Sequence, residues 1–310
     1  MFRILPGAYL GWGLGGNGAA NILGPPVTSG LINYRRAVVL AAIFIFLGAI
    51  LEGRKCFATV GGITVLNLKA AFIATLAAAI IVNLMSWLGF PVSTSQAIIG
   101  SIVGIGLLNH VAISFHKLTR VIVCWLFTPL GAAIISYLLF ILLCHFYRRK
   151  VKNIQLFNSV AKVSCCIICC YAAYNLGANN VANTTGPFVA AGILSPFLAT
   201  FIGGMSISLG VLTYGKNVIF TVGKRIAPLD PFSGLVALLS TAVTLHLFTQ
   251  IGVPVSSSQA VVGAVAGVGV ARGARTLSKT TLFLIFVSWI LTVLLSLGLA
   301  YALGFLLKGW

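Results

Sequence analysis

The sequence predicts an all-α integral membrane protein of about ten spanning or re-entrant helices in two homologous repeats, with broken helices that meet at a central site. Three observations lead to this prediction. The composition is too apolar for a soluble domain, apolar segments follow one another along the chain, and two polar motifs each occur twice in the same order. The class of function is inferred from the same observations.

The composition excludes a water-covered surface. The 310 residues are 59% hydrophobic and only 7% charged, whereas about a quarter of the residues of a soluble domain are charged. The charges are 20 Lys and Arg against two acids, Glu52 and Asp230. A net charge of +18 can indicate nucleic-acid binding. Here the basic residues stand in short groups between apolar runs, which is typical of membrane loops near anionic headgroups and could also attract an anionic substrate.

Apolar segments that suit a membrane, where a helix needs about 20 residues to cross, recur along the chain. Six uninterrupted candidates are residues 37–52, 66–89, 121–146, 195–214, 233–251 and 281–306. Two more, 5–33 and 155–194, are interrupted by Gly, Asn and Pro, and another two, 91–109 and 254–271, open with Pro and a polar cluster. Residues 1–10 lack the basic region and cleavage site of a signal peptide.

Two motifs are duplicated at almost constant spacing. Residues 15–30, GGNGAANILGPPVTSG, match residues 177–192, GANNVANTTGPFVAAG, at an offset of 162. Residues 90–106, FPVSTSQAIIGSIVGIG, match residues 253–269, VPVSSSQAVVGAVAGVG, at an offset of 163. Two matched motifs in the same order indicate an internal duplication.

The duplication divides the chain into a first repeat, residues 1–150, and a second, residues 151–310, which together form one intertwined transport unit. The boundary falls in the basic loop near 148–155, and its basic cluster at 148–152 is the best candidate for a cytoplasmic loop. The repeats are inverted if each half crosses the membrane an odd number of times. Interrupted hydrophobic segments at corresponding positions of two halves indicate a secondary transporter with its site at the repeat interface.

The first motif places amides inside apolar helices. Asn17 and Asn21 are four residues apart and share one helix face, as do Asn179 and Asn183. Polar groups are costly in a membrane unless they are satisfied. We expect the following Gly-Pro to break each helix and to free backbone groups. In a membrane, such irregular backbone is tolerated only where it is buried in the protein or lines a cavity. Hydrogen bonding between helices is the alternative role of these amides.

The second motif, P-V-S-[TS]-S-Q, predicts a helix N-terminus within the membrane, because Pro suits the first helical turn. The free N–H groups and positive dipole end of such a helix favour an anion. Ordinary N-capping is the alternative role of the hydroxyls. Two such ends could enclose one tetrahedral oxyanion with donors from Ser93, Thr94, Ser95, Gln96, Ser256, Ser257, Ser258 and Gln259.

With these pairs, GGNGAAN/GANNVAN and PVSTSQ/PVSSSQ, the chain resembles the PiT inorganic phosphate transporter family over nearly its whole length. The resemblance implies inverted repeats with re-entrant hairpins, ion-coupled uptake of an inorganic oxyanion and a homodimer in the cell membrane. It also implies that the Ser, Thr and Gln clusters hold the anion. The Asn-rich segments would support the anion and the coupling cation, through Asn17, Asn21, Asn179, Asn180 and Asn183.

The chain departs from the family pattern in one respect. The first motif of phosphate carriers in this family usually reads G-A-N-D, but Gly18 and Asn180 stand at the aspartate position here. Phosphate keeps a proton near neutral pH and gains from a carboxylate acceptor. Sulfate has no proton to donate, so a carboxylate would leave an unpaired acceptor that costs about 1–3 kcal/mol. A donor-only site favours sulfate, as in the sulfate permeases of this family, and phosphate is the alternative.

The missing carboxylates also bear on the coupling ion, which is H+ or Na+. They argue mildly against strong sodium dependence. The titratable candidates for proton coupling are Glu52, His110, His246 and Lys216. An acid in the membrane is a candidate functional residue, but Glu52 could equally be a loop residue paired with Arg54 or Lys55.

Other classes of protein fit less well. An anion channel could use the same paired helix ends, and the interrupted helices of a scaffold or receptor subunit could merely pack. An enzyme is excluded because no acid pair, nucleophile with base or metal-ligand spacing is found. Cys165, Cys166, Cys169 and Cys170 lie in an apolar helical stretch, where we expect packing rather than metal binding. We expect no organic cofactor.

Overall fold

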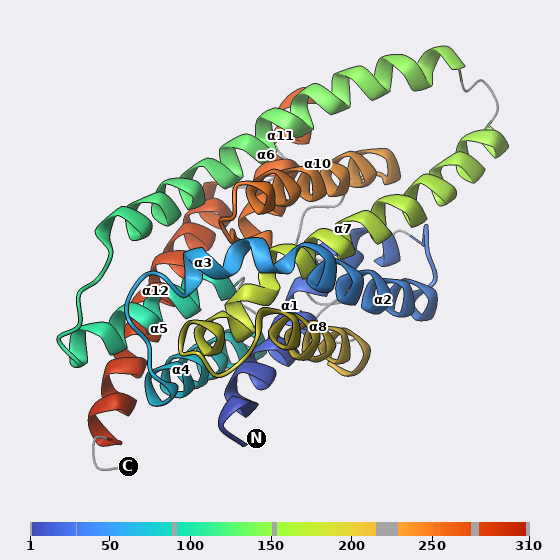
Figure 1. The fold of residues 1–310 in the computed structure, drawn as a ribbon. Helices are drawn as coiled ribbons and strands as arrows, with labels where there is room; N and C mark the ends of the chain where they lie inside the picture. The colour runs from blue at the N-terminus through green and yellow to red at the C-terminus, as the bar shows by residue number, and fades with distance from the viewer. Residues whose placement is uncertain are drawn as a thin grey trace.

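The computed structural model of the chain describes residues 2–28, 30–88, 92–150, 154–214, 229–273 and 279–307, and these ranges are helical with short connections (Figure 1). Thr64 and Ile113 form an isolated antiparallel bridge. The longer helices are α1 (Leu5–Thr28), α2 (Tyr34–Glu52), α4 (Leu68–Trp87), α5 (Thr94–Leu108), α6 (Phe115–Lys150), α7 (Ile154–Ala190), α8 (Pro196–Thr213), α10 (Pro231–Gln250), α11 (Ser257–Ala271) and α12 (Lys279–Leu306). The short elements are η1 (Phe2–Ile4), η2 (Gly53–Cys56) and α3 (Phe57–Val60).

Each of the predicted segments coincides with a helix, which confirms the all-α membrane fold. Seven helical stretches of the described residues are long and apolar enough to cross a membrane. By contrast, α5 and α11 have 15 residues each. At 1.5 Å per residue each is about 22 Å long, shorter than a hydrocarbon core of about 30 Å. Their polar N-terminal ends therefore lie at some depth within the protein.

The helices of the two halves correspond in sequence position. The bounds of α4 and α10 differ by 163 residues at both ends, and so do those of α5 and α11. Contacts cross between the halves in a reciprocal way, because α5 packs on α12 while α11 packs on α6, and α2 packs on α7 while α1 packs on α8. The halves are thus interleaved. Residues 151–153, at the predicted boundary, lie outside the described residues, and the inverted orientation stays a prediction.

Glycines allow these exchanged helices to approach closely. A Cβ on Gly48 of α2 would overlap the carbonyl oxygen of Tyr174 in α7, and a Cβ on the equivalent Gly210 of α8 would overlap the carbonyl oxygen of Trp12 in α1. The same close contact therefore occurs twice, once from a glycine of the first half to the second half and once from a glycine of the second half to the first. Small residues at helix crossings are the usual way in which membrane helices pack without a hydrophobic driving force.

The predicted helix break at Gly-Pro in the first motif was wrong. Helix α1 continues through Gly24 and Pro25 to Thr28, and α7 continues through Pro187 to Ala190. Each proline lies in the last turn of its helix, where the missing N–H costs only one hydrogen bond and the helix ends within three residues. The amides of this motif therefore project from regular helices.

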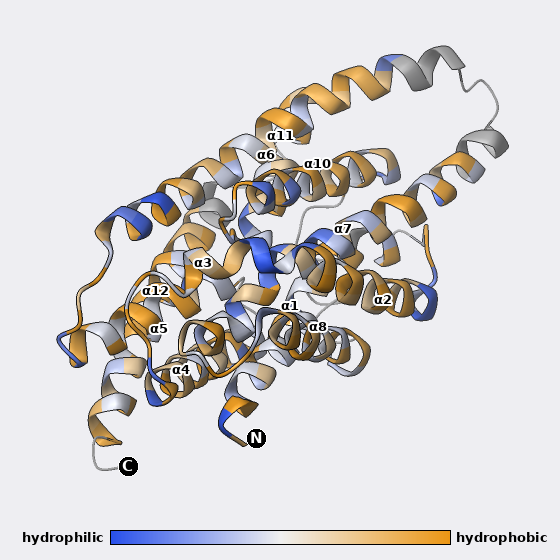
Figure 2. Ribbon diagram, viewed as in Figure 1, coloured by the Kyte–Doolittle hydropathy of each residue, from blue (hydrophilic) through white to orange (hydrophobic). Residues whose placement is uncertain are grey.

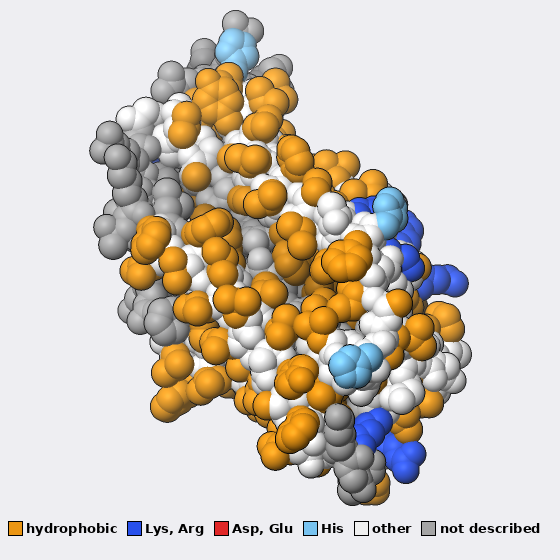
Figure 3. Space-filling view, turned by 90° about the vertical axis from the view of Figure 1, so that its left-hand side faces the viewer, with side chains coloured by type: hydrophobic (Ala, Val, Ile, Leu, Met, Phe, Trp, Pro, Cys, Tyr) orange, Lys and Arg blue, Asp and Glu red, His pale blue; other side chains and the backbone are white. Residues whose placement is uncertain are grey.

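Apolar side chains cover much of the outside of the molecule. In Figure 2 the helices are largely hydrophobic along their length, with hydrophilic residues gathered near several helix ends. In Figure 3 apolar side chains spread over the visible face, and Lys and Arg lie toward its margin. This distribution is that of a multi-pass membrane protein, in which basic residues favour the regions near the lipid headgroups.

We predict that Gly210→Ala lowers the stability of the protein by about 1–3 kcal/mol, because the added methyl group overpacks the α1–α8 contact. The thermal midpoint of the purified protein in detergent measures this effect. Gly131→Ala in α6 is the matched control, because a Cβ there meets open space, and alanine should be neutral or stabilising by up to about 1 kcal/mol. Equal midpoints for the two variants would contradict the assigned packing.

Candidate functional site

The predicted helix N-termini of the second motif are present. Ser93 caps α5 by accepting a hydrogen bond from the backbone N–H of Gln96, and Ser256 caps α11 by accepting one from Gln259, both over 3.3 Å. These two hydroxyls therefore have the N-capping role that was the alternative prediction. An N-cap satisfies one of the four free N–H groups of a helix, so other donors of both first turns stay available.

The two helix ends lie against each other through reciprocal hydrogen bonds. The Ser95 hydroxyl at the start of α5 donates to the Val255 carbonyl before α11, over 3.1 Å. The Ser258 hydroxyl at the start of α11 donates to the Val92 carbonyl before α5, over 3.4 Å. Ser256 and Ser258 also lie within 2.8 Å of each other. The predicted meeting of the two polar clusters, one from each half, is thus observed; Pro91 lies outside the described residues.

Asn179 of α7 holds the backbone before α11. Its Oδ1 accepts a hydrogen bond from the Val255 N–H over 2.9 Å. Its Nδ2 donates to the Thr249 hydroxyl over 2.9 Å and lies 3.4 Å from the Val253 carbonyl oxygen. The side chain is fully buried. A buried extended segment cannot form hydrogen bonds with water. The Asn179 amide therefore supplies hydrogen-bond partners to the backbone of the segment before α11.

The equivalent amide of the first half makes the corresponding contact. Asn17 of α1 donates to the Ser86 hydroxyl of α4 over 2.9 Å, as Asn179 does to Thr249 of α10. These two asparagines therefore join helices, which was the alternative role for the motif. Ser86 and Thr249 were not predicted, since a hydroxyl late in an apolar helix carries no signal by itself.

The second asparagine of each motif differs between the halves. Asn183 donates to the Ser95 hydroxyl and to the Asn180 Oδ1, both over 3.1 Å. Its equivalent in α1, Asn21, is buried with no hydrogen-bond partner for its Nδ2. Asn180 has Gly18 as its counterpart, so the first half lacks this neighbouring amide. Asn21 therefore presents a free donor inside the protein.

Several other amide atoms near the two helix ends are also unpartnered in the described part of the chain. They are the side-chain oxygens of Gln96, Asn183 and Gln259. A terminal amide can present either its oxygen or its NH2 group after a half-turn. Thr94 is buried beside them, and Ser257 is half-buried. Unpaired buried polar groups are costly, so a cluster of them in a native protein is typical of a site that binds a polar ligand.

Neither acid of the chain belongs to this cluster. Asp230 caps α10 and pairs with Arg272, with 2.6 Å between Oδ2 and Nη1. Burial alone would raise the pKa of this carboxyl, but hydrogen bonds from Ser233 and the Arg272 charge bring it below its ordinary value. Glu52 ends α2. The predicted site residues are all neutral, so the positive ends of two helices are not offset by a carboxylate.

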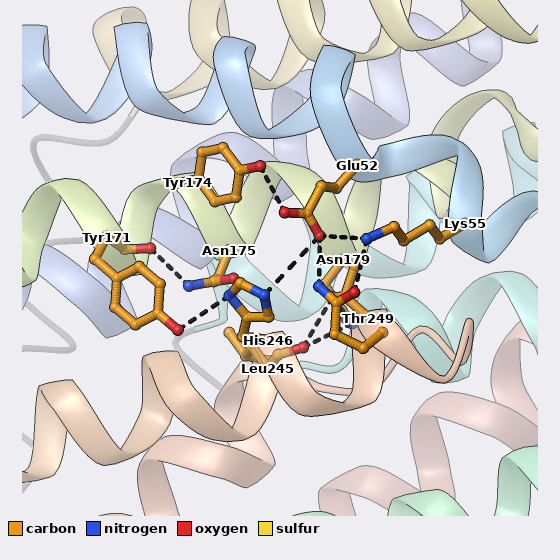
Figure 4. A network of polar contacts seen from close by, with 10 residues as sticks. Glu52, Lys55, Tyr171, Tyr174, Asn175, Asn179, Leu245, His246 and Thr249 are labelled. Atoms are coloured by element: carbon orange, nitrogen blue, oxygen red, sulfur yellow. Dashed lines mark hydrogen bonds and ion pairs between the residues drawn. The ribbon is translucent and has the colours of Figure 1, made fainter.

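Glu52 lies in a polar network that the sequence did not reveal (Figure 4). Its carboxylate accepts hydrogen bonds from Tyr174 over 2.8 Å, Lys55 over 2.9 Å and Gln250 over 2.6 Å. His246 Nε2 lies 4.0 Å from the same carboxylate. The pairing with Lys55 agrees with the loop alternative, but the other partners come from α7 and α10. Asn179 lies beside this network in Figure 4.

The other sequence candidates lie elsewhere. His110 is in the turn after α5, at the opposite end of that helix from Ser95, and Lys216 lies outside the described residues. Cys165 and Cys169 are buried in the core on α7, with their sulfur atoms 3.9 Å apart.

A multi-pass helical fold with buried polar groups between two helix ends is compatible with a membrane transporter, and comparison with known proteins supports this class. The model of the phosphate transporter family matches residues 14–300, and the chain belongs to this family. A solved structure described as the sodium-dependent phosphate transporter superposes with a TM-score of 0.86 at 25% identity, over 99% of this chain and 98% of that one.

Relatives within this family carry two different substrate names. The sulfate permease CysP of Bacillus subtilis is 29% identical, over 98% of this chain and 86% of its own length. A protein of Chlamydia pneumoniae named "putative phosphate permease" is 26% identical, over 94% of both chains. A protein of Pyrococcus furiosus with the same description is 28% identical, over 94% of this chain and 92% of its own length.

We predict that Asn179→Ala lowers the thermal midpoint more than Asn17→Ala does. The first change leaves the buried Val255 N–H without its partner, which costs about 1–3 kcal/mol, and also removes a hydrogen bond to Thr249, whose hydroxyl still donates to the Leu245 carbonyl. The second removes one hydrogen bond to Ser86, whose hydroxyl also donates to the Val82 carbonyl. A larger loss for Asn17→Ala would contradict this ranking.

Proposed function

We propose that the chain is a secondary active transporter that moves sulfate across the cell membrane by cation symport, with the anion bound between the N-termini of α5 and α11. The observation that carries this proposal is the reciprocal contact of Ser95 with Val255 and of Ser258 with Val92. It brings two positive helix ends, one from each half, to one place in the protein.

An anion would be stabilised at this place by several neutral donors. Backbone N–H groups of two helix first turns and the positive ends of two dipoles favour negative charge. The hydroxyls of Ser95 and Ser258 add side-chain donors once their present carbonyl partners are exchanged for the ligand, and the amides of Gln96 and Gln259 add further donors. Such donors surround a tetrahedral oxyanion better than a planar carboxylate, because its acceptors point in all directions.

The choice of sulfate depends on the missing carboxylates. Gly18 and Asn180 stand where phosphate carriers of this family have aspartate, and the chain's two acids are Glu52 and Asp230. Against fully deprotonated sulfate, the neutral amides of this site can present their NH2 groups, whereas a carboxylate could only leave an unpaired acceptor. The sulfate permease of Bacillus subtilis among the relatives agrees with this choice.

Phosphate transport coupled to Na+ or H+ is the second candidate. The family description, the named permeases and the sodium-dependent structural neighbour all favour it. The unpartnered amide oxygens of Gln96, Asn183 and Gln259 could accept the phosphate proton or coordinate Na+. The homodimer implied by the family resemblance remains a prediction, and an anion channel would differ by failing to accumulate its substrate against a gradient.

The direct test is uptake of radiolabelled sulfate and phosphate into proteoliposomes of the purified chain. Sulfate uptake that excess phosphate does not inhibit is the expected result, because the site lacks the carboxylate that would favour the phosphate proton. Phosphate uptake that excess sulfate does not inhibit would overturn the choice of sulfate and would leave the second candidate.

We predict that Ser95→Ala, Gln96→Ala, Ser258→Ala and Gln259→Ala each raise the half-saturating anion concentration by about 10- to 150-fold, as expected for a lost hydrogen bond to a charged group of about 1.5–3 kcal/mol. Membrane insertion should be retained. Ser288→Ala, which removes a buried hydroxyl on α12, is the control. Unchanged uptake kinetics in all four variants would refute the site.

We predict that Asn180→Asp shifts the preference from sulfate toward phosphate, because it restores the carboxylate acceptor beside Asn183. The measurement is the ratio of phosphate to sulfate uptake under competition. Asn67→Asp adds a carboxylate away from the site and keeps the N-cap of α4, so it serves as the charge control. The account of specificity fails if the ratio stays unchanged in Asn180→Asp or shifts equally in the control.

A further inference from the structure

The corner where α2, α7 and α10 meet holds a titratable pair beside the proposed anion site. Glu52 ends α2, and its carboxylate lies 4.0 Å from Nε2 of His246 on α10. The Tyr171 hydroxyl of α7 lies 3.0 Å from the other ring nitrogen, Nδ1 (Figure 4). The Glu52 and His246 side chains are 20% and 29% exposed, so neither is sealed inside the protein.

The duplication provides an internal comparison for this corner. In the other half, Tyr214 stands at the position of Glu52, Asn83 at that of His246 and Trp12 at that of Tyr174. There the rings of Trp12 and Tyr214 pack with centroids 4.5 Å apart. The same arrangement of helices can therefore be closed by aromatic packing, so the fold itself does not need a charged pair here.

A purely structural role explains the pair poorly. A carboxylate at the last residue of a helix opposes the helix dipole. Its ion pair with Lys55 is partly exposed, with 38% of the Lys55 side chain accessible, and such pairs stabilise proteins little. The corner thus carries an unfavourably placed acid and a histidine where the equivalent corner has neither.

The corner is linked to the anion site through one turn of α10. His246, Thr249 and Gln250 lie on this turn, and Gln250 donates to Glu52 while Thr249 accepts from Asn179. Asn179 in turn holds the Val255 N–H, and the Val255 carbonyl accepts from Ser95. A change in how Glu52 holds α10 can therefore reach the backbone that precedes α11.

We propose that His246 binds the proton that is transported with the anion, and that Glu52 is its counter-ion. This inference rests on the proposed symport function and names the site of its coupling ion. The anion site has no titratable side chain of its own, so a coupling proton must be held beside it. Histidine is the side chain whose charge changes most readily near neutral pH.

Proton binding would rearrange the corner without breaking a covalent bond. The proton adds to the free ring nitrogen of His246, and both ring N–H groups then donate, one toward Glu52 and one toward the Tyr171 hydroxyl. The imidazolium then competes with Lys55 and Gln250 for the carboxylate, which shifts α10 against α2.

The other titratable or charged groups around this pair come from each neighbouring element. Tyr171 and Tyr174 belong to α7, Lys55 and Arg54 to η2, and Arg120 of α6 donates to the Ile251 carbonyl at the end of α10. Among these groups, the Glu52 carboxylate is the negative charge that lies beside His246.

The test compares wild type with His246→Asn and Glu52→Gln in proteoliposomes. Asparagine is the residue of the equivalent corner, so this change suits the fold there. Two processes are measured: exchange of labelled anion across the membrane at equal pH, and uptake driven by a pH gradient that is acidic outside. An entrapped pH dye follows proton entry. His116→Asn, an exposed histidine at the start of α6, is the control.

Both variants should retain exchange but lose the stimulation by the pH gradient and the anion-induced proton entry, while the control behaves as wild type. The inference is overturned if His246→Asn keeps gradient-driven uptake, if both variants lose exchange as well, or if wild-type transport ignores the pH gradient. Absence of sulfate and phosphate exchange in the wild type would instead contradict the proposed function.

Discussion

The centre of this protein depends on one constraint. Backbone that is buried but not helical must still form hydrogen bonds within the protein. The segments before α5 and α11 are extended and lie inside an apolar molecule, where water cannot satisfy them. Ser95 and Ser258 each donate to a carbonyl of the opposite segment, and Asn179 binds the Val255 N–H. These side chains keep the polar ends of the two short helices together at depth.

The reciprocal packing of the halves supports this centre. Each of the helix pairs α2–α7 and α1–α8 joins one half to the other, with Gly48 and Gly210 at equivalent close contacts. Because the two halves are nearly equivalent, the positions at which they differ are candidates for a functional role. Asn183 has partners where Asn21 has a free donor, and Glu52 stands where the other half has Tyr214. A single anion bound between the halves would thus contact a different set of polar groups from each half.

Much of the fold, and the meeting of the two helix ends at the candidate site, could be predicted from the sequence, because a repeated motif marks equivalent positions in the two halves. The spacing of PVSTSQ and PVSSSQ predicted two helix N-termini, and these lie together. The Gly-Pro break was wrong because those prolines fall in the final turn of α1 and α7. The network of Glu52 was out of reach of sequence reasoning, since its partner Gln250 is 198 residues away and no motif links them.

The most direct measurement is the position of a bound anion in an experimental structure of the protein with selenate, whose selenium gives an anomalous signal and whose shape and charge match sulfate. The account predicts one selenium peak between the N-termini of α5 and α11, within hydrogen-bonding reach of Ser95 and Ser258. A peak elsewhere in the protein, with the Ser95–Val255 and Ser258–Val92 contacts intact, would contradict it.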